Sequence, residues 1–156
     1  MTQNCQTFER EFFRTINKYL EPLARAGLGS PGVVPIGAIV LETKGRKSGT
    51  LYRTPLIATE FIDVLLVSTG RKQSQWIRNL AATPRTHIWL RARYRPVMAY
   101  IVGPEITLDP LPGQPSPRAK LILEAARQLN RLTGNSYAVL DTRLEGENNG
   151  SKGEER

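Results

Sequence analysis

The spacing of apolar residues predicts a helical start to the chain. Between residues 7 and 25, apolar side chains recur at helical spacing, and basic or polar side chains occupy the other side, which predicts an amphipathic helix. Gly27 and Gly29 end this helix, and Pro31 follows. The helix either covers one side of a sheet or rests on a membrane surface, because it carries three phenylalanines and a partly basic polar face.

The middle of the chain is predicted to form closely spaced strands. Apolar and β-branched runs place them at 36–43, 53–60, 64–68, 86–93 and 96–102, with a sixth at 136–144. The fourth and fifth strands are joined by a tight turn at 93–95. Strands this close together, mostly antiparallel, predict a small β-barrel or a strongly coiled sheet.

Two further helices are predicted among the strands. Residues 75–82 form a short helix that ends at Thr83-Pro84, and a longer helix begins at Ser116-Pro117 and ends near Leu132. One face of the longer helix carries Leu121, Ala125, Leu129 and Leu132. The class is therefore mainly β (α+β).

The chain of 156 residues has the length of one domain. We divide it into an N-terminal amphipathic helix and linker (1–34), a barrel domain (35–144) and a charged, Gly/Asn-rich tail (145–156) that we expect to be disordered. The chain has no signal pattern and no apolar run near the ~18 residues that cross a bilayer. These features predict a cytoplasmic protein, with contact to the inner face of the membrane through the first helix as a further expectation.

Positive charge is concentrated in one segment of the chain. The net charge is +8, and residues 44–104 alone hold eleven Lys and Arg against two acids, which makes that segment +9. A positive field of this kind favours an anionic partner. The candidates are a phosphorylated cofactor, nucleic acid and an anionic membrane surface.

A glycine-bracketed basic turn, Thr43-Lys44-Gly45-Arg46-Lys47-Ser48-Gly49, stands at the start of this segment. The glycines let consecutive backbone N–H groups point into one concavity, and the basic and hydroxyl side chains add charge and hydrogen bonds. The turn is therefore either an anion site or a plain hairpin turn with solvated side chains.

Trp76 and Asn79 share one face of the short helix that follows a basic loop. Together they could hold a flat aromatic ligand, or they are a core tryptophan and a surface amide. Cys5 and His87 are the only residues of their types, which argues against a disulfide, a Cys/His metal site and a Ser-His-Asp triad. We expect no bound metal.

The sequence resembles the deazaflavin (coenzyme F420)-dependent nitroreductase and quinone reductase family, which is typical of actinobacteria. The resemblance rests on the runs 41–49, 53–56 and 76–84 in this order, and it covers roughly residues 8–104. It implies a split β-barrel related to the FMN-binding flavin reductases. It also implies hydride transfer from reduced F420 to a quinone, enone or nitro acceptor.

The resemblance also implies the residues of a cofactor site. Those matched to the acidic tail of the coenzyme are Arg46, Lys47, Ser48, Arg53, Arg71 and Lys72. Those matched to its phospholactyl chain and ring are Pro55, Ser68, Thr69, Trp76 and Asn79.

Several points stay open at the level of the sequence. Many relatives carry a second arginine where this chain has Tyr52, and the proton could come from Tyr100, Tyr137 or water. Two alternatives remain: an FMN-binding split-barrel reductase, and a non-enzymatic basic module that binds nucleic acid or anionic membrane. Under the first hypothesis the partner is a small electrophilic substrate and no nucleic acid is bound. The oligomeric state stays open, with a homodimer as one candidate.

Overall fold

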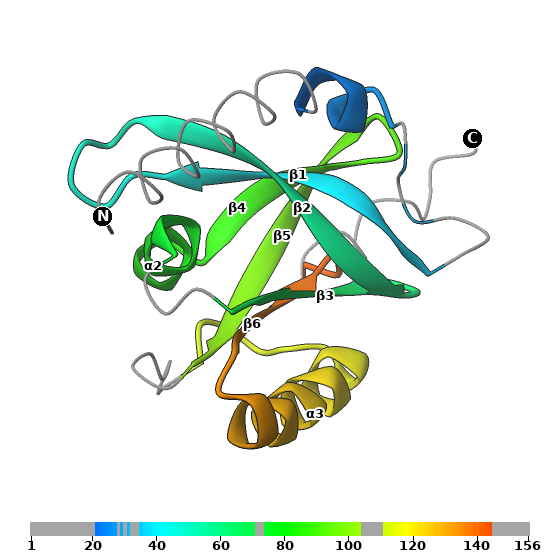
Figure 1. Cartoon of the computed structure of the whole chain (residues 1–156), viewed down its shortest axis with the longest axis vertical. Helices are drawn as coiled ribbons and strands as arrows, with labels where there is room; N and C mark the ends of the chain where they lie inside the picture. The colour runs from blue at the N-terminus through cyan, green and yellow to red at the C-terminus, as the bar shows by residue number, and fades with distance from the viewer. Residues whose placement is uncertain are drawn as a thin grey trace, which may run out of the picture.

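The computed structural model describes residues 21–27, 29, 31, 35–70, 74–103 and 111–144 (Figure 1). Residues 21–25, where this part of the chain begins, are helical. The elements that follow are β1 (Ile36–Lys44), β2 (Leu51–Phe61), β3 (Val64–Thr69), α2 (Gln75–Ala82), β4 (Arg85–Leu90), β5 (Arg93–Val102), α3 (Pro117–Thr133) and β6 (Ser136–Asp141).

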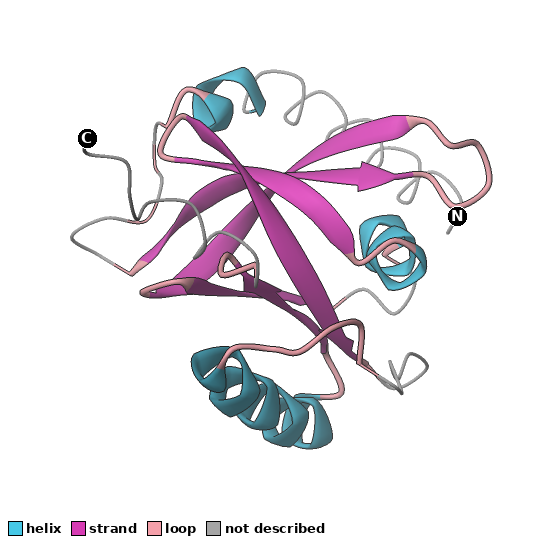
Figure 2. Cartoon of the chain, turned by 180° about the vertical axis from the view of Figure 1, so that it is seen from behind, coloured by secondary structure: helices cyan, strands magenta, loops and turns pink. Residues whose placement is uncertain are grey.

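The strands form a closed antiparallel barrel in the order β1-β2-β3-β6-β5-β4. The pairing of β1 with β2 is long, with nine paired positions from Ile36–Thr59 to Lys44–Leu51. The pairing of β1 with β4, which closes the barrel, has three, Val40–Trp89 to Glu42–His87. Both views show α2 close to the end of the β1–β2 hairpin and α3 along the side of the barrel (Figures 1 and 2). The predicted mainly β barrel is confirmed.

Alternation along the strands divides the apolar residues into two clusters. One fills the barrel and includes Leu41, Ile88 and Leu140, and α2 contributes Ile77 and Leu80 to it. Since these two side chains join the interior, α2 covers one end of the barrel.

The second cluster lies between the barrel wall and α3. Its fully or nearly buried members are Val64, Tyr100, Ala119, Leu123, Ala126, Tyr137 and Val139. The leucine face predicted for this helix points away from the cluster, since Leu121 is 70% and Leu132 is 82% exposed. The ends of α3 follow the sequence signals: Ser116 Oγ accepts a hydrogen bond from the Ala119 amide, and Gly134 has a φ of 69°.

The turn predicted at 93–95 is wrong. Arg91 and Ala92 form it instead, with φ of 51° and 60°, so that Leu90 pairs with Arg93. Turns of this backbone hand normally use Asn or Gly, and the sequence offered neither. Arg91 is held from outside the hairpin, since its Nε donates to the Pro31 carbonyl at 2.7 Å and its guanidinium pairs with Glu60.

The predicted first helix lies largely outside the described residues, and the predicted disordered tail lies wholly outside them. Within the described part of the chain, no helix has both the length and the apolarity to cross a bilayer. The contact of the first helix with a membrane stays a prediction.

Candidate functional site

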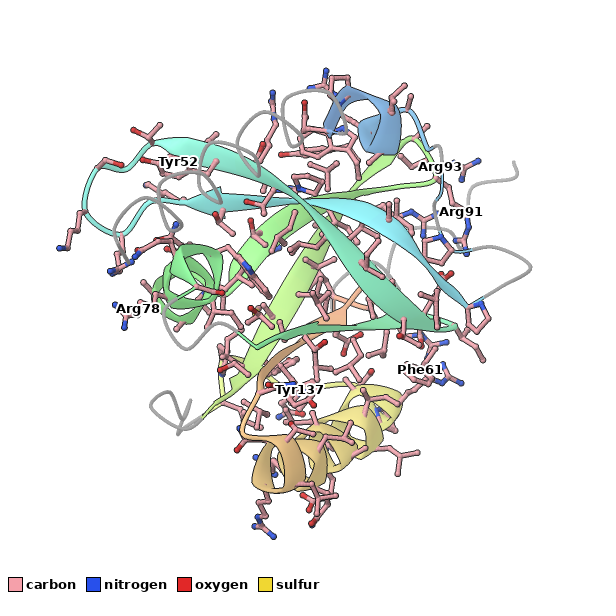
Figure 3. All side chains as sticks on the ribbon, viewed as in Figure 1. Tyr52, Phe61, Arg78, Arg91, Arg93 and Tyr137 are labelled. Atoms are coloured by element: carbon pink, nitrogen blue, oxygen red, sulfur yellow. The ribbon has the colours of Figure 1, made fainter. Side chains whose placement is uncertain are left out.

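A groove of about 520 Å³ lies where the β1–β2 hairpin meets α2. Figure 3 shows Tyr52, one of its residues, at the same end of the barrel as α2. The residues that line the groove are Thr43, Gly45, Arg46, Lys47, Ser48, Tyr52, Thr54, Gln75, Trp76 and Asn79. The structure thus brings together the basic turn and the tryptophan-bearing helix that the sequence singled out separately.

The turn has a defined internal geometry. The Gly45 amide donates to the Thr50 carbonyl at 2.7 Å, and the Gly49 amide donates to the Gly45 carbonyl at 2.8 Å. A Cβ on Gly45 would lie 2.7 Å from Ser48 Oγ and 2.8 Å from Tyr52 Cε2, so any larger residue here would force these two side chains to move. Gly49 has a φ of 70°, which a side chain would strain.

Asn79 attaches this turn to α2. Its Oδ1 accepts hydrogen bonds from the Arg46 backbone N (3.3 Å) and from Arg46 Nη1 (3.4 Å). Gln75 Oε1 accepts a shorter one from the same Nη1, at 2.9 Å. The Asn79 oxygen is therefore used to position the turn, a role that sequence reasoning did not anticipate.

The rim of the groove is positively charged. Arg46, Lys47 and Ser48 are exposed, and the residues lining the groove include no aspartate or glutamate. Tyr52 is 48% exposed and its hydroxyl lies 3.4 Å from Ser48 Oγ. Anionic groups are favoured at this rim, because nothing there opposes the two cations.

The floor of the groove is neutral. Thr54 and Trp76 are half-buried, and Trp76 packs against the barrel core. Thr43 is 1% exposed, and its hydroxyl has no hydrogen-bond partner among the described residues. A cationic rim above a floor with an aromatic side chain and a free hydroxyl suits a ligand with a flat polar head and an acidic tail.

Arg53 and Pro55 do not line the groove. Side chains alternate along β2, so the two residues lie on the opposite face from Tyr52 and Thr54. Arg53 Nε lies 3.5 Å from Glu42 Oε2 on the outside of the barrel. The groove therefore does not include these two residues, and their placement in the cofactor site stays a prediction.

Arg53 belongs to a polar and aromatic cluster on the outer face of the barrel. The Tyr94 hydroxyl donates to Glu42 Oε1 at 2.7 Å, and burial together with this carboxylate raises the pKa of Tyr94 to about 12. The rings of His87 and Tyr94 are stacked at 4.5 Å, and the Arg53 guanidinium lies 5.0 Å from the centre of the Trp89 ring. His87 therefore has a structural setting away from the groove.

The segment after β3 is partly described. Ser68 is exposed at the end of the strand, and Thr69 Oγ1 lies 2.9 Å from the hydroxyl of Ser74, just before α2. Neither lines the groove. The predicted site residues Arg71 and Lys72 lie outside the described residues.

The two tyrosines named as proton donors do not line the groove. Tyr100 is 1% and Tyr137 is 6% exposed, both in the cluster beneath α3. The Tyr137 hydroxyl lies 3.0 Å from Thr133 Oγ1, and Figure 3 shows this tyrosine between the barrel and α3. The phenol that does line the groove is Tyr52, which the alternation of β2 with Thr54 could have indicated.

The sequence model of the family described as F420H(2)-dependent quinone reductase matches residues 23–108. A protein of Mycobacterium tuberculosis (strain ATCC 25618 / H37Rv), Rv3178, which is named for F420H(2)-dependent quinone reductase activity, is 35% identical over 80 residues. The match covers 49% of this chain and 67% of that protein.

Two solved structures are more distant. One is described as an F420-H2 dependent reductase (FDR-A), with 19% identity, a TM-score of 0.43 and coverage of 69% of this chain and 94% of the other. The second is described as a domain-swapped dimer, with 18% identity, a TM-score of 0.43 and coverage of 87% and 98%. Both are too distant to bear on the activity or assembly of this chain, and the homodimer stays a prediction.

These sequence matches define an oxidoreductase that uses reduced coenzyme F420. The chain belongs to the F420H2-dependent quinone reductase family, since the family match spans more than half of its length. FMN binding without F420 and a non-enzymatic basic module are not favoured.

Proposed function

We propose that the groove between the β1–β2 hairpin and α2 is the F420 site, and that the protein reduces a quinone, enone or nitro acceptor there. The observation that carries this proposal is the meeting of the cationic turn with Trp76 in one groove. The acidic tail of the coenzyme lies on Arg46, Lys47 and Ser48, and its ring lies along Trp76 and the neutral floor.

The residues present fit both parts of the coenzyme. Two cations, a hydroxyl and the absence of a carboxylate in the groove suit a phosphate and carboxylates. The volume of about 520 Å³ falls within the ~300–1,000 Å³ usual for a small-molecule site.

When bound, the reduced deazaflavin supplies a hydride to the acceptor. The protein binds the tail, and Trp76 holds the ring in a fixed orientation. The rim is open to water, and Tyr52 is the phenol within it, so these two are the proton sources at the groove.

The proposal is tested by following tryptophan fluorescence during titration with F420 and, separately, with FMN. Trp89 lies in the outer cluster, so Trp89→Phe leaves Trp76 as the reporting ring. We expect quenching at micromolar F420 and at least about tenfold weaker binding of FMN, which has a shorter and less acidic tail.

The tail site is tested by Arg46→Ala with Lys47→Ala, which should weaken F420 binding by about a hundredfold. The matched control is Lys120→Ala with Arg131→Ala, two exposed cations of α3. Equal loss in both double variants would show an effect of net charge alone. An unchanged affinity in the first double variant would show that the tail does not bind at this turn.

A further inference from the structure

The hydroxyl of Thr43 is buried and has no hydrogen-bond partner among the described residues. Three buried side-chain oxygens lack a hydrogen bond among the described residues: Glu21 Oε1, Thr43 Oγ1 and Asp63 Oδ2. The two carboxylate oxygens face arginines, at 3.6 Å from Arg25 and 2.6 Å from Arg143. Thr43 has no such compensation, although it is 1% exposed.

A nearby threonine shows what the fold does with an ordinary buried hydroxyl. Thr86, on β4, is 8% exposed and its Oγ1 donates to the Glu42 carbonyl at 2.5 Å. Thr43 is the next residue along β1 from Glu42, yet it faces the groove and finds no acceptor or donor. A buried polar group without a partner destabilises the folded chain, so an unpaired hydroxyl that faces a groove points to a hydrogen bond with a ligand.

We infer that the Thr43 hydroxyl forms a hydrogen bond with the ring edge of the coenzyme bound in the groove; this inference rests on the proposed function above. A hydroxyl is both donor and acceptor, so it can pair with a ring carbonyl or a ring N–H. The tail is excluded as its partner, because a single neutral hydroxyl at a buried floor position does not compensate the burial of a phosphate or carboxylate. The exposed cations of the rim do so.

The assignment divides the groove into two independent parts. Arg46 and Lys47 recognise the tail, and Thr43 recognises the ring. The contact of Thr43 with the ring should therefore contribute equally to the binding of full F420 and of the deazaflavin riboside, which lacks the phosphate and glutamates.

The test compares Thr43→Val and Thr43→Ser with the wild type in titrations with both ligands. Valine keeps the shape and removes the hydroxyl, and serine keeps the hydroxyl. We expect Thr43→Val to weaken the binding of both ligands by about tenfold. The affinities of Thr43→Ser should stay within about threefold of wild type. In the ligand-free protein, Thr43→Val should raise Tm by about 2 °C, since an unpaired buried hydroxyl is removed.

Thr86→Val is the matched control, because it removes a hydroxyl that has a partner. It should lower Tm and leave both affinities unchanged. The inference is overturned if Thr43→Val leaves both affinities unchanged or weakens only full F420. Failure of the proposed function looks different: the Arg46→Ala and Lys47→Ala double variant would then bind full F420 normally, whatever Thr43→Val does.

Discussion

Glu42 points to the outer face of the barrel, where neighbouring side chains cover it and leave it only 6% exposed. A phenol donates to it from Tyr94, and the Arg53 guanidinium lies beside it. Tyr94 is 48% exposed as a whole residue, but its ring is stacked on His87 and its hydroxyl is held against Glu42, so partial desolvation and then this carboxylate raise its pKa. Ionising this tyrosine would place a second negative charge against the first, so the cluster depends on a protonated phenol.

Tyr94 therefore predicts a loss of stability at high pH. Its pKa is about 12 in the folded chain, above the ordinary value of 10.0, so its contribution is complete below pH 10 and is lost as the pH rises towards 12. We expect the difference in unfolding free energy between wild type and Tyr94→Phe to be constant below pH 10 and to shrink above it. Urea unfolding at several pH values measures this difference. A difference that stays constant to pH 12 would contradict the assignment.

At the scale of elements, α2 has two functions in one short helix. Ile77 and Leu80 cover the end of the barrel, while Asn79 and Gln75 hold Arg46 of the β1–β2 turn. The position of the turn thus depends on a helix that lies about 30 residues further along the chain.

Asn79→Ala tests this attachment. The change removes the acceptor of both Arg46 hydrogen bonds, each with a net value of about 1 kcal/mol, so F420 affinity should fall about tenfold. The amide of Arg46 should also exchange with solvent faster. Asn79→Gln keeps a neutral amide acceptor and adds no charge to the groove, so it is the control, expected within about threefold of wild type. An unchanged amide exchange rate at Arg46 in Asn79→Ala would show that the turn keeps its position without the Asn79 contact.

Local patterns were sufficient to predict most elements. The strands and both later helices lie close to their predicted positions, because alternation, Ser116-Pro117 and Gly134 are strong local signals. The turn at Arg91 and Ala92 was missed because its left-handed backbone accompanies contacts with distant residues, Pro31 and Glu60. The sequence also did not predict that the leucine face of α3 is exposed. The small residues Ala119 and Ala126 pack against the barrel instead.

The candidate site was partly predictable for the same reason. Arg46, Lys47, Ser48, Trp76 and Asn79 line the groove as expected. Arg53 was placed in the site from a neighbouring motif position. Side chains alternate along β2, so Tyr52 points into the groove and Arg53 points to the opposite face. Thr43 could not be singled out, because its importance lies in the absence of a partner, which only the folded chain reveals.

For the whole molecule, closure of the barrel rests on its shortest pairing. Three positions join β1 to β4, whereas nine join β1 to β2. The Thr86 hydroxyl adds a side-chain hydrogen bond to the Glu42 carbonyl across this seam. Opening of the barrel should therefore begin between β1 and β4, where the fewest hydrogen bonds must break.

Amide hydrogen exchange checks this prediction. We expect the amides of residues 40–42 and 87–89 to exchange sooner than the central amides of the β1–β2 pairing. Thr86→Val should accelerate them further, by about tenfold for a loss of about 1.4 kcal/mol. Thr133→Val is the control, because its hydroxyl bonds with Leu129, Asn135 and Tyr137, away from the β1–β4 pairing. Equal acceleration by both variants would place the first opening elsewhere.

The hold of Gln75 and Asn79 on Arg46 has a consequence for the timing of ligand capture. Arginine is among the side chains that lose most rotamer freedom when ordered, about 1.5–2 kcal/mol. Here much of that entropy is lost when the chain folds, because amide oxygens already fix the guanidinium. An incoming anion meets a charge that is already in place, so association needs no rearrangement of Arg46 and is set by encounter with the groove.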